Sequence, residues 1–274
     1  MANLCGLTQP QLEQAKQIIF SRGRLLERQL YRYFFEEGDR TAALQALLAY
    51  QNPDGGFGNG LEPDLLCPGS SAIAAETALF MLDLLDYRAP DIIVPLLDWL
   101  AANQDEAGGM VHPPQDLAQY PYQPWWDKDD ASRVLVLAAQ LKDWQETKPS
   151  FFAKARQFYE QDGVPEQLSF YSYPTFAYLK HYQQTAADEA AFAGLVEKLP
   201  VVLAESADHF PLFGRYWYYA QGDVAAGVME RAVAAVVAGF GPEGGLANPY
   251  SDLPWWQPIF TLDSLILLKK GGHL

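Results

Sequence analysis

The sequence predicts an all-α fold that is built from repeated helix pairs. Apolar residues recur at helical spacing along most of the 274 residues, and no stretch shows the period-two alternation of a β-strand. A glycine-rich loop, Pro53-Asp54-Gly55-Gly56-Phe57-Gly58, separates two helical stretches and has weaker copies at Gln104-Asp-Glu-Ala-Gly-Gly-Met-Val and Gly241-Pro-Glu-Gly-Gly-Leu-Ala. A loop that recurs at the same kind of joint indicates an architecture of repeated helical hairpins.

Composition supports a globular chain and argues against some partners. Hydrophobic residues make up 49% of the sequence and charged residues 19%, and we expect residues 1–274 to form a single domain without an internal linker. The net charge of −15 argues against nucleic-acid and anionic-membrane partners, which attract clustered Lys and Arg. No stretch approaches the roughly 20 apolar residues of a membrane span, and no signal peptide is visible at the N-terminus. The expected location is the cytoplasm.

Caps and apolar spacing predict the helices of the first half. Thr8 caps a helix over residues 10–36, which Gly38 ends, and Asp39 caps the next helix, over residues 41–50. Ser70 or Ser71 caps a helix over residues 72–87, which has so few polar positions that we expect it to be buried. Pro90 opens a helix over residues 91–103, which leads into the second glycine loop.

The second half continues the helical series after a long loop over residues 105–127. That loop carries His112-Pro-Pro and a Pro-Trp-Trp triplet that ends at Trp126, and a second Pro-Trp-Trp triplet ends at Trp256. Asp162-Gly163-Val164-Pro165 reads as a degenerate glycine loop. Helices are predicted over residues 129–144, 150–161, 174–184, 188–206, 211–220, 223–240 and 259–270.

Two kinds of helix alternate along the chain. Five are bounded by cap residues and partly charged, and six follow loops and are more apolar. This alternation predicts a closed ring, in which the apolar helices line the core and the others face water. The acidic and aromatic loops, at residues 62–64, 125–130 and 252–256, would then meet at one mouth of the ring.

The repeated loop resembles a known motif. An outer helix, then Gln51-x-x-Asp-Gly-Gly-Phe-Gly, then an inner helix is similar to the repeat of the terpenoid cyclase and protein prenyltransferase superfamily. The copies at Gln104 and Gly241 keep the paired glycines but lose the aromatic residue after them. The resemblance implies an α/α toroid of about eleven or twelve helices. It also implies a bracing role for the motif, in which Gln51 bonds the exposed amides of the next helix and Phe57 stacks beside it.

The clearest chemical motif is Asp127-Lys128-Asp129-Asp130-Ala131-Ser132, at the head of an apolar helix. It is similar to the Asp-x-Asp-Asp acid motif of class II terpene cyclases. That resemblance implies that Asp129 protonates an alkene or epoxide of an isoprenoid-type substrate, while Asp127 and Asp130 tune it. Neighbouring carboxylates repel one another, which raises the pKa of one of them, and burial raises the pKa of a carboxyl further. In the alternative interpretation, these residues only cap the first turn of the helix.

Loop aromatics and a second acidic pair complete the expected site. Indole faces can stabilise a carbocation, whereas Glu62 and Asp64 in the first glycine loop fit a carbohydrate-processing (α/α) barrel enzyme, with Asp129 as a further candidate carboxyl. His112 could act as a base. The expected substrate-binding residues are Glu62, Asp64, His112, Tyr122, Trp125, Trp126, Trp255 and Trp256.

We expect neither a metal nor another cofactor. Protein prenyltransferases hold zinc through Asp, Cys and His, but Asp64-Leu-Leu-Cys67 has a different spacing and no histidine is suitably placed. Phosphate-loop, dinucleotide and serine-nucleophile motifs are missing. The preferred hypothesis is a cyclase-like enzyme for an apolar, isoprenoid-type ligand with Asp129 as proton donor. The alternatives are a carbohydrate-processing enzyme and a toroid that binds a ligand or protein without catalysis.

Overall fold

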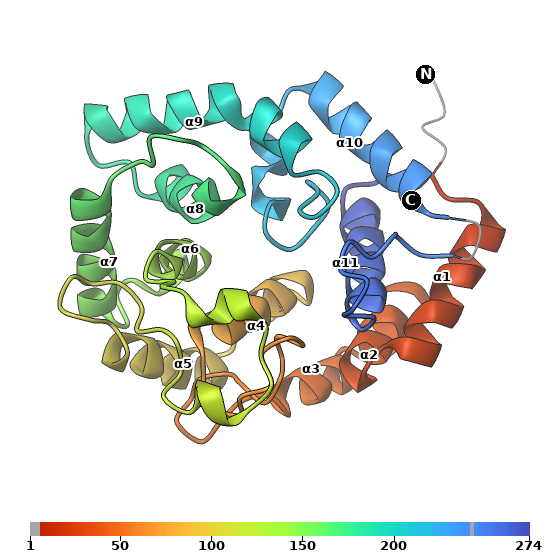
Figure 1. Ribbon diagram of the computed structural model, residues 1–274, viewed down its shortest axis with the longest axis horizontal. Helices are drawn as coiled ribbons and strands as arrows, with labels where there is room; N and C mark the ends of the chain where they lie inside the picture. Colours follow the sequence, from red (N-terminus) through yellow and green to blue (C-terminus); the bar gives the residue numbers. More distant parts are fainter. Residues whose placement is uncertain (1–5, 242–243) are drawn as a thin grey trace. The chain divides into compact units, whose positions relative to one another are not determined.

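The computed structural model (Figure 1) describes residues 6–241 and 244–274. The chain divides into two compact units. Unit 1 comprises Met1–Ala46 and Leu199–Leu274, and unit 2 comprises Leu47–Lys198. Two parts of the chain lie outside the described residues. They are residues 1–5, where no signal peptide was expected, and Pro242 and Glu243 of the third glycine loop. The described residues form eleven α-helices and no β-strand, so the all-α prediction is confirmed. No helix in this part of the chain has both the length and the apolar composition needed to cross a bilayer.

Unit 2 packs a buried layer of helices against an outer layer (Figure 1). Helices α4 (Ala72–Leu84), α6 (Arg133–Gln140) and α8 (Tyr173–His181) are buried along most of their length. Helices α5 (Pro90–Ala102) and α7 (Pro149–Asp162) bury one side only. Helix α6 packs between α4 and α8 and also contacts α7. The alternation of buried and half-exposed helices expected from the sequence is therefore present within this unit. Short 3-10 helices occur at η1 (Leu117–Gln119), η2 (Pro124–Asp127), η3 (Lys142–Trp144) and η4 (Phe170–Ser172).

Unit 1 is organised around its last helix. Helix α11 (Trp256–Lys270) is buried along most of its length and packs against α1 (Gln9–Arg22) and α2 (Leu25–Phe35). Its apolar residues surround the helix axis, as the burial of the helix requires. The remaining elements of the chain are η5 (Tyr218–Asp223) and α10 (Ala226–Gly239) in this unit, and α3 (Arg40–Leu48) and α9 (Ala186–Glu205), whose ends belong to different units.

The three glycine loops share one local structure. An isolated antiparallel bridge closes each loop, between Gln51 and Phe57, Gln104 and Met110, and Phe240 and Leu246. In the first two loops the glutamine Nε2 donates to a carbonyl of the same loop, at 3.1 Å from Gly55 O and from Gly108 O. The glutamine therefore braces its own loop, whereas the sequence predicted that it would bond the amides of the next helix. Gln104 Nε2 also donates to Phe151 O in α7, at 3.1 Å.

One glycine in each loop presses against the backbone of another helix. These glycines are Gly55, Gly108 and Gly244, with φ of +91°, +95° and +78°. A Cβ atom at Gly55 would lie 2.4 Å from Pro95 O in α5, and one at Gly108 would lie 2.1 Å from Lys154 O in α7. At Gly244 it would lie 2.3 Å from the Cβ atom of Gln14 in α1. Glycine is required at these positions because both the φ value and the close approach exclude a side chain.

Two predicted helices differ from the structure by a break or by more than three residues at an end. The helix expected over residues 10–36 is broken because Gly23 is extended, with φ −72° and ψ 153°, and Glu27 accepts the N–H of Arg24 at 2.8 Å to start α2. The helix expected over residues 129–144 begins only at Arg133, because the aspartates before it hold a turn.

Two further predictions were wrong. Residues 211–220 form turns and the start of η5 instead of a helix, because Ser264 Oγ donates to Phe213 O at 2.8 Å and Arg215 pairs with Asp263 of α11. Within the described residues no bridge closes residues 162–165, and Gly163 follows the last residue of α7. These long-range contacts are not visible in local propensity.

We expect Gly108→Ala to lower the free energy of unfolding by about 2–4 kcal/mol, because the new Cβ would overlap Lys154 O as well as disfavour a positive φ. Urea denaturation followed by circular dichroism measures this change.

Gly272→Ala is the matched control. Gly272 also has a positive φ of +73°, but nothing lies within 4 Å of the position of its Cβ. It should cost only about 1 kcal/mol, the conformational part of the effect. Equal costs for the two variants would contradict a role for close packing at Gly108.

Candidate functional site

The Asp-x-Asp-Asp run lies in the loop before α6, and its members differ in environment. Asp127 and Asp129 are exposed, and Asp129 Oδ1 accepts the N–H of Ala131 at 3.1 Å. This is the capping arrangement that was the alternative interpretation of the motif. Asp130 is half-buried and forms an ion pair with Arg133, whose Nη2 donates to Asp130 Oδ1 at 3.0 Å.

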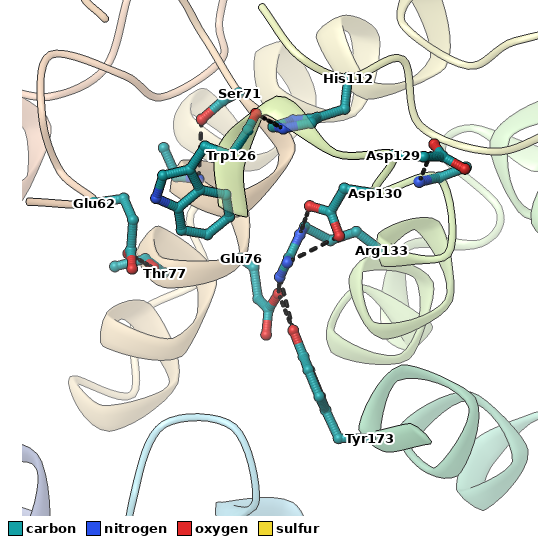
Figure 2. Close-up of polar contacts among 12 residues, drawn as sticks. Glu62, Ser71, Glu76, Thr77, His112, Trp126, Asp129, Asp130, Arg133 and Tyr173 are labelled. Atoms are coloured by element: carbon teal, nitrogen blue, oxygen red, sulfur yellow. Dashed lines mark hydrogen bonds and ion pairs between the residues drawn. The ribbon is translucent and has the colours of Figure 1, made fainter. Parts of the chain in front are cut away.

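Arg133 connects Asp130 to two buried groups on neighbouring helices (Figure 2). It forms an ion pair with Glu76 of α4, and its Nη1 donates to the Tyr173 hydroxyl at 2.7 Å. The Tyr173 hydroxyl in turn donates to Glu76 Oε2 at 3.0 Å. Glu76 is only 3% exposed. We call Glu76, Asp130, Arg133 and Tyr173 the Glu76 cluster.

The Glu76 cluster places two carboxyls around one guanidinium. Burial raises the pKa of Glu76, and the charge of Asp130 raises it further. Arg133 and the Tyr173 hydroxyl lower this pKa, but they offset only part of the shift. Burial by itself lowers the pKa of the Arg133 guanidinium. Asp130, Tyr173 and Glu76 outweigh burial and hold this pKa well above its ordinary value. Glu76, the more buried carboxyl, therefore keeps its proton to higher pH than an exposed glutamate.

A further buried carboxyl lies against the same part of α4. Glu62 is 1% exposed, and its Oε2 accepts a hydrogen bond from Thr77 Oγ1 at 3.0 Å (Figure 2). Because Thr77 directly follows Glu76, the Glu62 and Glu76 carboxyls lie beside one turn of the helix. The first glycine loop and α4 therefore place two buried acids beside consecutive residues of one helix.

Trp126 links the first glycine loop to the Glu76 cluster. Its Nε1 donates to the buried Asp64 at 2.7 Å, and the Arg133 guanidinium lies 6.0 Å from the centre of its indole ring. His112 Nε2 donates to the Trp126 carbonyl at 2.8 Å, which leaves Nδ1 unprotonated and, among the described residues, buried without a hydrogen-bond partner. Burial lowers the pKa of His112, which favours the neutral ring.

The predicted aromatic residues are divided between exposed and buried positions. Trp125 and Trp255, the first tryptophan of each Pro-Trp-Trp triplet, are 38% and 39% exposed. Trp126 and Trp256, the second of each, are buried. Tyr122 is half-buried and bridges Leu65. Trp125, Trp126 and Tyr122 belong to unit 2 with the Glu76 cluster, and the other two tryptophans belong to unit 1.

The buried tryptophan of each triplet has a guanidinium over its ring. In unit 1 this is Arg215, 5.5 Å from the Trp256 ring centre and paired with Asp263 of α11 at 2.8 Å. In unit 2, Arg133 has the same relation to Trp126 and Glu76. Trp126 and Trp256, two of the four tryptophans predicted to bind substrate, are therefore already next to a cation of the protein itself.

Sequence reasoning missed Glu76, Arg133 and Tyr173. A usable signal was present, because Glu76 is a single charged residue within the apolar stretch that α4 buries on all sides. Charged side chains are seldom fully buried unless they are paired, so such a residue marks a buried polar contact. In the described part of the chain, no group of three or more His, Cys, Asp or Glu side chains is arranged to hold a metal ion.

No protein-family model matches the sequence, and no curated protein matches it. The geometry of the Glu76 cluster is therefore the basis on which chemistry can be assigned.

The raised pKa of Glu76 predicts a specific pH dependence of stability. Its contribution is fully present below the unfolded pKa of about 4.5 and is lost as the pH rises through the folded pKa, since the folded state then has to ionise a buried carboxyl. Glu76→Gln removes this term. The stability of the variant relative to the wild type should therefore increase by up to about 1.4 kcal/mol per pH unit above pH 4.5, as measured by urea denaturation between pH 4 and 7.

Glu27→Gln is a control of opposite sign. Glu27 of α2 is also buried, but Arg24 outweighs the effect of burial and lowers its pKa. Its stabilising contribution is therefore present above pH 4.5 and is lost as the pH falls. The Glu27→Gln variant should become less stable relative to the wild type as the pH rises toward 4.5. A pH-independent difference for Glu76→Gln would show that its carboxyl ionises normally.

Proposed function

We propose that this protein is an acid–base enzyme that acts on a carbohydrate-type substrate, with Glu76 as proton donor and Glu62 as the second carboxyl. The observation that carries the proposal is the burial of both carboxyls beside one turn of α4, where Glu76 has a raised pKa. Two titratable groups in different environments are the usual basis for dividing acid and base roles at neutral pH.

We further propose that the chain is an α/α toroid like those of the terpenoid cyclase and protein prenyltransferase superfamily. The repeated glycine contact supports this. The loop with Gly55 precedes the buried helix α4 and packs on α5, the next α-helix. The loop with Gly108 precedes the buried helix α6 and packs on α7, again the next α-helix. The last such loop, with Gly244, packs on α1, the first helix of the chain. A series whose last member returns to its first element is the pattern of a ring.

In this mechanism each residue of the site has one task. Glu76 gives its proton to the leaving oxygen, while Arg133 and the Tyr173 hydroxyl hold its carboxyl in place. Glu62, oriented by Thr77, acts on the opposite side as base or nucleophile. The exposed indole of Trp125 offers an apolar face for a sugar ring. Asp129 has a structural task, the turn that precedes α6.

A second candidate function is acid-initiated cyclisation of an isoprenoid-type ligand. One observation favours it: Asp130, from the Asp-x-Asp-Asp run, shares Arg133 with a buried acid whose pKa is raised. In this version Glu76 replaces Asp129 as the proton donor. The guanidinium over the Trp126 ring argues against it, since a carbocation there would be repelled.

The test is turnover of a panel of 4-nitrophenyl glycosides and oligosaccharides by the wild type and by single variants. We expect hydrolysis of at least one member, with kcat lowered at least about 100-fold by Glu76→Gln and by Glu62→Gln. Asp129→Asn is the matched control, an acid-to-amide change at the predicted motif, and should alter kcat by less than about twofold.

The same variants should be incubated with squalene and geranylgeranyl diphosphate and the products separated by gas chromatography. The cyclase assignment would replace the carbohydrate assignment if two results were found together. The wild type would form cyclised products that Glu76→Gln does not form, and it would hydrolyse no member of the glycoside panel. Loss of activity in Asp129→Asn, but not in Glu76→Gln, would contradict both assignments of the proton donor.

A further inference from the structure

Unit 1 contains a cavity that the proposed function does not use. Its volume is about 410 Å³, within the roughly 300–1,000 Å³ range of small-molecule sites. It lies between the C-terminal part of α9, helix α10, the third glycine loop and α11, and its largest apolar lining residues are Leu203, Leu212, Val236, Leu246 and Phe260.

The cavity follows one face of α10. The lining residues of this helix recur three or four positions apart, from Val228 through Ala232 and Val236 to Gly239. They therefore share one face, and the eleven steps from Val228 to Gly239 at 1.5 Å each give a length of roughly 16 Å. Ala235 has a small side chain and Gly239 has none, so this face of the helix leaves room for a ligand. An unbranched chain fits such a shape better than a compact ring system does.

Arg231 brings a positive charge to the part of the cavity beside the first turn of α10. Arg231 lines the cavity, is exposed, and forms no ion pair with any described residue. Its Nη1 lies 3.6 Å from the position that a Cβ of Gly227 would occupy, so the guanidinium extends back over the first turn of α10. That turn has no side-chain cap and no acidic residue. The free N–H groups of the helix N-terminus add to the positive potential there.

The other polar lining residues are Asp208 and His209, which follow α9. The His209 ring packs edge-on against Tyr250, at 5.6 Å between centres. Asp208 contributes one negative charge to the lining, which balances the charge of Arg231 and disfavours ligands with several anionic groups.

We propose that this cavity binds a linear amphiphile with one carboxylate, a fatty acid. The hydrocarbon chain lies along the apolar face of α10, and the carboxylate pairs with Arg231 beside the first-turn N–H groups of the helix. All the residues involved belong to unit 1, so the proposal is independent of the Glu76 cluster.

The first test is calorimetric titration of the full chain with dodecanoate, below its micellar concentration, and with 1-dodecanol and dodecyltrimethylammonium as neutral and cationic probes. We expect one dodecanoate per chain, weaker binding of dodecanol and none of the ammonium. Arg231→Gln should weaken dodecanoate about five- to tenfold and leave dodecanol unchanged. Lys198→Gln, the same charge change at an exposed lysine outside the cavity lining, should change neither affinity.

A second pair of variants tests the location. Ala235→Trp places an indole in the cavity and should abolish binding of both dodecanoate and dodecanol, whereas Ala234→Trp, at the exposed neighbour outside the lining, should leave both unchanged. Melting temperatures would verify that both variants are folded.

Three results would overturn the proposal. The first is absence of dodecanoate binding to the wild type, and the second is an equal loss of affinity in Arg231→Gln and Lys198→Gln. The third is self-association of the wild type that Ala235→Trp prevents while dodecanoate has no effect, which would assign the cavity to a second copy of the chain.

Discussion

Close approach between a glycine and the backbone of a neighbouring helix is the constraint on which the rest of this structure depends. It recurs at Gly55, Gly108 and Gly244, where the loop backbone occupies space that any Cβ would fill. Each contact sets the position of a loop relative to one helix while the antiparallel bridge closes the loop itself. The first two loops also bond to the segments that enter the following buried helices, because Ser71 N–H donates to Phe57 O at 2.9 Å and Met110 N–H donates to Ala131 O at 3.1 Å.

Both units contain a buried ion pair between an arginine and a carboxylate of a buried helix, Arg133 with Glu76 and Arg215 with Asp263. Removing two charges from water has a large desolvation cost, and well-packed apolar residues are often at least as stable in such places. Burial raises the pKa of both carboxyls. In unit 2 the arginine is further shared with Asp130, and a second buried acid, Glu62, lies nearby. This surplus of carboxyl groups over cations is why we assign chemistry to unit 2.

Much of the fold and part of the site could be predicted from the sequence. The glycine loops and the helix starts at Thr8 and Ser71 are local features, because caps and turns depend on residues a few positions apart. The Asp-x-Asp-Asp run contributes Asp130 to the Glu76 cluster, whereas Asp129, the predicted proton donor, is exposed and holds a turn. In this cluster the acid with the raised pKa is Glu76, whose partner Arg133 is 57 residues away. Local spacing has no access to such a pair.

The sequence by itself determined that this chain is all-helical, where its loops need glycine, and that acidic and aromatic residues gather in the loops before α4 and α6. These properties follow from backbone sterics and periodicity, which act over one or two turns. Only the tertiary structure decided which carboxyls have a raised pKa, which tryptophan faces a guanidinium and where unit 1 is hollow. Burial and the charges of distant residues control the first two, and the third depends on which side chains meet around α10. All three exist only after helices that are remote in the sequence have packed together.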